Sequence, residues 1–220
     1  MEIYLFENDD LLLFLKVFED AVKTVRNGAV DWNYPEDGQP KLRNMHETTG
    51  WLTTKGGVSS ISVDGACADV MTAVARILGS PELVVFFQEK SFWEFSLFVD
   101  QAPVINFSTA AAEWGEVDPN AYFGTPHDLA EIWKVPVERI ERYMVDWGPT
   151  ERWIEEYKVM SLAFLMEGQK AYPEDEFEYG QLYQGFDFIR ALGGHLPSND
   201  HPKDYKEFLI HLPPPQRNKS

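Results

Sequence analysis

The chain has 220 residues, of which 44% are hydrophobic and 14% aromatic, which is enough apolar material for a packed core. Its 36 acidic residues outnumber its 19 basic ones and give a formal net charge of -17. Such a surface repels nucleic acid and anionic lipid, so we expect neither as a partner and favour basic proteins or cations.

The cysteine content limits both redox compartment and metal chemistry. Cys67 is the only cysteine, so an internal disulfide and a zinc site built from several thiolates are both excluded. Glu2 and Glu7 stand where a secretory leader needs positive charge, and the apolar run 11–15 is too short to cross a bilayer. We therefore expect a cytoplasmic protein that neither enters a membrane nor carries an export signal.

The first third of the chain predicts strands and helices in alternation. Residues 3–6 read as a strand, and apolar residues at helical spacing then predict a helix from about Asn8 to Asn27. Turn-forming residues fill the long segment 29–57, where we expect only a short strand near 51–54. A strand at 58–63 follows, and Asp64-Gly65 opens a second helix that stops at Gly79.

The middle of the chain predicts a β-meander and then helices. Residues 83–87 are continuously apolar, as in a strand covered on both faces, and the segments 93–99 and 104–107 complete three antiparallel strands. Thr125-Pro126 marks the start of a short helix, and the spacing of apolar residues in 137–144 predicts a second one, so the two make a helical hairpin.

The last third predicts two more helices and ends in a tail. The ranges 151–167 and 177–192 have helical spacing, and 205–212 predicts a strand or turn. We expect one α+β domain over 1–212, in which an antiparallel sheet built around 83–108 carries its helices largely on one face, and a flexible tail at 213–220.

A search for catalytic or metal-binding chemistry gives only weak candidates. Cys67 falls in the first turn of the second predicted helix, where the helix dipole favours a nucleophilic thiolate, although a small buried side chain is the simpler interpretation. Asp200, His201 and Asp204 make the densest group of potential metal ligands, in a loop where polar residues are expected anyway. We therefore assign no catalytic residue, no metal site and no cofactor.

Acidic segments that carry aromatic rings are the best candidates for a binding site. No lysine or arginine lies between Lys90 and Lys134 or between Lys170 and Arg190. Aromatic anchors surrounded by negative charge are typical of surfaces that bind a basic protein, whereas rings folded back into the core are the competing interpretation. The candidate partner-binding residues are Glu113, Trp114, Glu116 and Asp118 in the first segment, and Tyr172, Glu174, Asp175, Glu176 and Glu178 in the second.

The stretch from Leu83 to Trp147 also carries a resemblance. An apolar strand, the run Ser91-Phe92-Trp93-Glu94-Phe95, the triplet Tyr122-Phe123-Gly124 and the helical run 129–140 resemble uncharacterised bacterial single-domain proteins of the toxin-immunity type. The segment 29–50 has no counterpart in them. The resemblance implies a non-catalytic inhibitor that occludes a basic toxin or nuclease.

Two other functions are compatible with the same sequence. One is a small-ligand-binding protein or hydrolase-like enzyme with a pocket near Cys67, and the other is a housekeeping interaction subunit or homodimer that uses the predicted helix 151–167.

Overall fold

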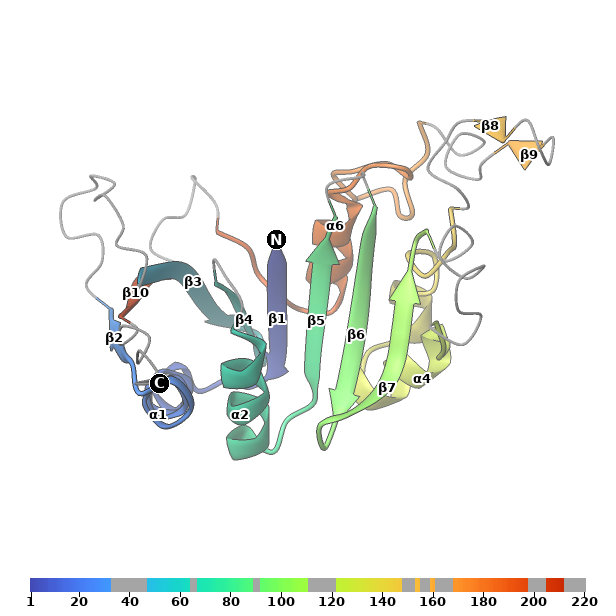
Figure 1. Cartoon of the computed structure of the whole chain (residues 1–220). Coiled ribbons are helices and arrows are strands. Elements are labelled where there is room, and N and C mark those ends of the chain that lie inside the picture. Colours follow the sequence, from blue (N-terminus) through green and yellow to red (C-terminus); the bar gives the residue numbers. More distant parts are fainter. Residues whose placement is uncertain are drawn as a thin grey trace, which may run out of the picture.

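A computed structural model describes most of the chain (Figure 1). The residues it describes are 1–32, 47–63, 67–88, 92–110, 122–147, 153–154, 159–160, 168–197 and 205–211.

One antiparallel sheet of eight strands forms the centre of the fold, in the order β2-β10-β3-β4-β1-β5-β6-β7. The N-terminal strand β1 lies inside the sheet, where it pairs with β4 on one side and β5 on the other. The strands are β1 (Glu2–Glu7), β2 (Ala29–Asp31), β3 (Glu47–Lys55), β4 (Val58–Val63), β5 (Glu82–Phe87), β6 (Trp93–Val99), β7 (Ala102–Ser108) and β10 (Lys206–His211). The α+β class and the predicted meander, now β5-β6-β7, are confirmed.

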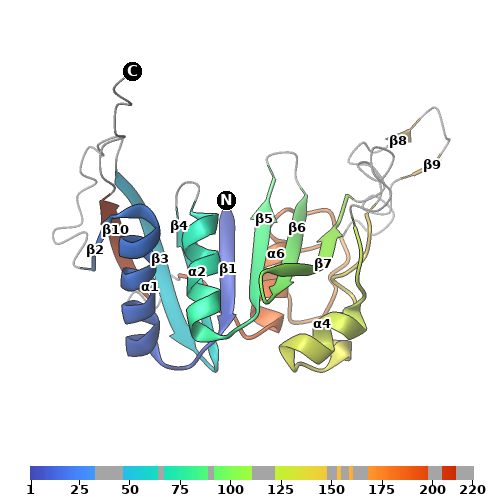
Figure 2. The same cartoon turned by 60° about the horizontal axis from the view of Figure 1, so that its bottom comes forward.

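Helices cover both faces of this sheet, which differs from the expected arrangement with helices largely on one face. Helices α1 (Leu11–Arg26) and α2 (Ala68–Leu78) lie side by side on one face (Figure 2). Helices α4 (Pro126–Trp133) and α6 (Gln184–Ala191) contribute to a second core on the opposite face. The strands supply both cores because their side chains alternate: Ile3 and Leu5 join the second core, whereas Tyr4 and Phe6 join the first.

Helix ends follow the capping signals in the sequence. Asp10 caps α1 by accepting a hydrogen bond from the Leu13 N–H, and Asn27 ends it in the left-handed conformation. Thr125, directly before Pro126, forms a capping box with Asp128 at the start of α4.

The prediction of a second helix in the hairpin is wrong. Where that helix was expected, α4 is followed by a 3-10 turn, η1 (Val137–Arg139). The chain beyond it is held by tertiary hydrogen bonds instead: the Tyr143 hydroxyl donates to Asp175, and the backbone N–H of Trp147 donates to the Thr109 carbonyl. These contacts override the helical spacing of the apolar residues.

Two further helix predictions also need correction. The helix predicted at 177–192 is shortened to α6, because Gly180 takes a positive φ of 80° and turns precede Tyr183. In the range 151–167, the described residues pair instead as two short strands, β8 (Trp153–Ile154) and β9 (Val159–Met160), and the other residues of that range lie outside the described part. The expected tail, 213–220, lies outside it as well.

Candidate binding cleft

A cleft of about 560 Å³ lies where the segment after α4, the loop 172–176 and helix α6 meet. Five carboxylates and two guanidinium groups line it, so the cleft is rich in negative charge. The lining residues with charged or aromatic side chains are Glu138, Arg139, Tyr143, Tyr172, Glu174, Asp175, Glu176, Asp187 and Arg190.

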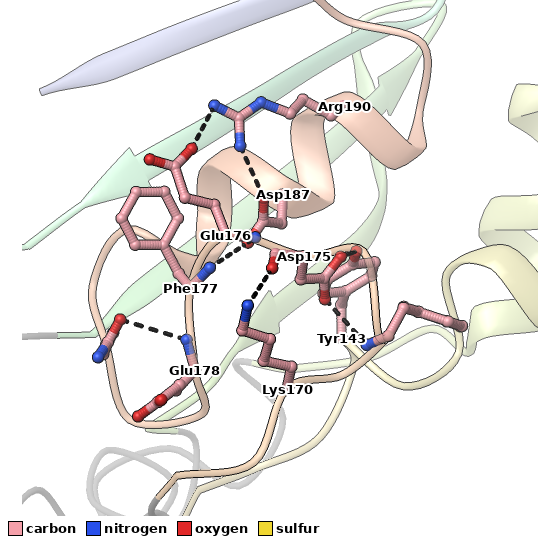
Figure 3. A network of polar contacts seen from close by, with 10 residues as sticks. Tyr143, Lys170, Asp175, Glu176, Phe177, Glu178, Asp187 and Arg190 are labelled. Atoms are coloured by element: carbon pink, nitrogen blue, oxygen red, sulfur yellow. Dashed lines mark hydrogen bonds and ion pairs between the residues drawn. The ribbon is translucent and has the colours of Figure 1, made fainter.

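Asp187 organises the wall that α6 provides (Figure 3). Its side chain is buried, and one carboxylate oxygen accepts hydrogen bonds from the backbone N–H groups of Glu176 (3.0 Å) and Phe177 (2.8 Å). Arg190, one turn further along α6, donates to the other oxygen at 2.7 Å and pairs with the Glu176 carboxylate at 3.0 Å. A buried charge needs such partners, so Asp187 fixes the loop to the helix.

Asp175 has the same function at the other end of the loop. This buried carboxylate accepts a hydrogen bond from the Tyr143 hydroxyl at 2.5 Å and another from the Tyr172 N–H at 3.0 Å. Burial raises the pKa of Asp175, and the two hydrogen bonds oppose that rise. Burial and the adjacent Asp175 both raise the pKa of Tyr143, which therefore stays protonated and remains a donor.

Basic residues from neighbouring segments surround this acidic loop. The Lys170 ammonium donates to the Asp175 backbone carbonyl at 2.6 Å. The Arg142 guanidinium lies 5.3 Å from the centre of the Tyr172 ring and also donates to the Ala171 carbonyl. The segment between Lys170 and Arg190 is therefore not a surface of one sign: Arg190 pairs with Glu176 and Asp187, whereas Glu174 is exposed at the cleft.

The predicted site residues divide into two groups. Tyr172, Glu174, Asp175 and Glu176 all line the cleft, and Glu178 lies beside it with its N–H donating to the Gln181 side chain. The other four predicted residues, Glu113, Trp114, Glu116 and Asp118, lie outside the described residues.

The acidic residues that line the cleft differ in exposure: two are buried and hold the loop in place, and others are exposed. Asp175 and Asp187 are buried and fully engaged in holding the loop, whereas Glu138 and Glu174 are exposed. Within the part of the chain that the structure describes, the side-chain carboxylates of Glu138 and Glu174 make no hydrogen bond or ion pair. These two rim carboxylates are therefore available to a ligand.

Sequence reasoning missed the wall opposite the loop. Glu138 and Arg139 fall within 137–144, which was predicted as a helix, and Asp187 and Arg190 fall within the predicted helix 177–192. The i, i+3 spacing of Asp187 and Arg190 could have predicted their ion pair, because opposite charges at that spacing meet on one helix face.

The cysteine and histidine candidates do not form a competing site. Cys67 is the N-cap of α2 and is buried, and burial raises the pKa of its thiol; this agrees with the simpler interpretation of a small buried side chain and not with a nucleophilic thiolate. Asp200, His201 and Asp204 lie outside the described residues. Among the residues that are described, no group of three or more His, Cys, Asp or Glu side chains is arranged to hold a metal ion.

The helices of the described part include none with the length and apolar character that a membrane span requires.

Comparisons with known proteins give no relatives for this chain: no family model, no curated protein and no solved structure matches it.

Proposed function

We propose that the protein is a non-catalytic binding protein whose acidic cleft receives a basic segment of a partner protein. The observation that carries this proposal is the meeting of four predicted binding residues with Glu138 and Asp187 around one cleft. Negative charge in a concave site raises the local concentration of cationic groups and speeds their association.

The cleft combines a fixed frame with accessible charge. Asp175 and Asp187 anchor the loop through short hydrogen bonds, so the rim carboxylates are presented without a large ordering cost on binding. The half-buried Tyr172 ring adds apolar area beside them. A rigid, charged and partly aromatic recess suits recognition of a lysine- or arginine-bearing segment.

The specific form that we propose is an immunity-type inhibitor that occludes a basic toxin or nuclease. The support for it is the resemblance of the stretch 83–147 together with the net charge of -17. Its mechanism is steric occlusion, in which long-range attraction speeds association and aromatic contacts slow release.

Fluorescence anisotropy with a labelled lysine–glycine peptide tests the general proposal. The double variant Glu138→Gln/Glu174→Gln removes the two rim carboxylates, and we expect it to weaken binding about fivefold at low salt, since each exposed pair contributes about 0.5 kcal/mol. The difference should fade as salt is added.

The matched control is Asp20→Asn/Glu207→Gln, which removes the same charge from exposed positions on α1 and β10. It should bind as the unmodified protein does. Equal losses in both double variants would show that the peptide responds to net charge alone, and an unmeasurable affinity for the unmodified protein would refute the proposed function.

A further inference from the structure

A column of aromatic rings leads from the core to the surface beside the cleft. Phe87, buried at the end of β5, contacts Phe186 with ring centres 4.8 Å apart. Tyr183 stacks on Phe186 at 5.3 Å with an interplanar angle of 24°, and Phe177 packs against both rings. The outermost ring, Tyr183, is 50% exposed. We call Phe177, Tyr183 and Phe186 the aromatic face.

The aromatic face adjoins the cleft because both are built on α6. Tyr183, Asp187 and Arg190 have i, i+4 and i+7 spacing, which places them along one side of the helix. The loop connects them a second time, since Glu176 pairs with Arg190 while the next residue, Phe177, packs its ring on Tyr183. A segment that extends from the cleft past Glu176 and Phe177 therefore reaches the Tyr183 ring.

An exposed aromatic ring beside carboxylates favours arginine over lysine. A guanidinium group is planar and weakly hydrated, so it stacks on an aromatic ring and donates hydrogen bonds to a carboxylate at the same time. The ammonium of lysine is a compact, strongly hydrated charge and does this less well. The chain contains a related contact: the Arg142 guanidinium lies 5.3 Å from the centre of the Tyr172 ring, at the other end of the same loop, and donates to the Ala171 backbone carbonyl.

We propose that the aromatic face docks an arginine side chain of the basic partner segment, with the guanidinium over Tyr183 and its N–H groups directed toward the acidic loop. The inference rests on the proposed function and adds to it that the partner is read through arginine rather than through lysine. Charge complementarity selects the occupant, since the exposed carboxylates of Glu138 and Glu174 line the adjoining cleft.

The test compares two labelled peptides of the same length, one of arginine and glycine and one of lysine and glycine. The unmodified protein should bind the arginine peptide about two- to fivefold more tightly, as expected for a cation–π contact at an exposed site. Tyr183→Phe keeps the ring and should keep this preference. Tyr183→Leu keeps apolar packing on Phe186 without an aromatic face and should bind both peptides equally.

The outcomes separate the two proposals. Equal binding of the two peptides by the unmodified protein, or a preference that survives in Tyr183→Leu, overturns the arginine inference and leaves the proposed function standing. Binding of neither peptide overturns both. Circular dichroism and urea unfolding of the two Tyr183 variants test whether each is folded. If the leucine variant does not fold, Tyr183→Phe alone decides the role of the ring. Loss of the arginine preference in this variant, which keeps the ring, would overturn the inference.

Discussion

A buried acid far from the cleft offers the sharpest quantitative test of the fold. Glu82 is the first residue of β5 and is only 4% exposed. Burial raises its pKa from the ordinary value of 4.5 to about 7, although a hydrogen bond with Thr72 opposes the rise. The folded protein therefore keeps a proton on Glu82 over a pH range in which the unfolded chain has already lost it.

The sign and size of the effect follow from proton linkage. Between pH 4.5 and 7 the folded state binds more protons than the unfolded state, so the free energy of unfolding falls as the pH rises. The total loss is about 3 kcal/mol, at about 1.4 kcal/mol for each pH unit of difference. About 2 kcal/mol of it falls between about pH 5.5 and 8.5, a range that avoids the isoelectric point near 4.6.

The variant Glu82→Gln replaces the titratable carboxyl group with an amide and keeps the shape of the side chain. Urea unfolding followed by tryptophan fluorescence should show that its stability gain over the unmodified protein grows by about 2 kcal/mol from about pH 5.5 to 8.5. Glu131→Gln, at an exposed position of α4, should show no such change with pH. A constant offset between Glu82→Gln and the unmodified protein across this range would refute a protonated Glu82.

Three further substitutions or modifications test other parts of the structure. Cys67 is buried with a raised thiol pKa, so iodoacetamide should modify the native protein far more slowly than the urea-unfolded one; equal rates would contradict its burial. In the described part, neither polar atom of the buried Gln184 amide has a hydrogen-bond partner, so Gln184→Met should raise the midpoint of urea unfolding, by about 1 kcal/mol in free energy; a loss of stability would reveal a partner. Asp187→Asn should cost about 2 kcal/mol, whereas Glu178→Gln should change stability by less than about 0.5 kcal/mol, and similar costs would contradict the anchoring role of Asp187.

Local signals in the sequence predicted the elements that local physics determines. The α1 helix has its caps at Asp10 and Asn27, and the α4 helix has its proline and capping box, so both could be placed from residue types alone. The meander was equally readable, because Trp93, Phe95 and Leu97 alternate with polar residues along one strand. In each case the pattern and the tertiary environment favour the same structure.

Long-range contacts determine the parts that were not predicted. The strand β10 inserts between β2 and β3 and so pairs with segments about 160 to 180 residues away, which no local pattern reveals. The same holds for the cleft: its acidic loop was visible as a charge pattern, but long-range hydrogen bonds such as Tyr143–Asp175 and Tyr172–Glu138 bring the wall of Glu138 and Arg139 to it. The ion pair between Arg190 and Glu176 of the loop is likewise a tertiary contact.

The most direct test of the proposed function is to map where a basic ligand binds on the folded protein. Titration of the isotopically labelled full chain with the unlabelled arginine–glycine peptide, followed by amide chemical shifts, should move the resonances of 138–143, 172–178 and 183–191 together. The resonances of α1 and α2, on the opposite face of the sheet, should stay in place. Shifts distributed over both faces, or confined to residues away from the cleft, would contradict the assignment of this cleft as the binding site.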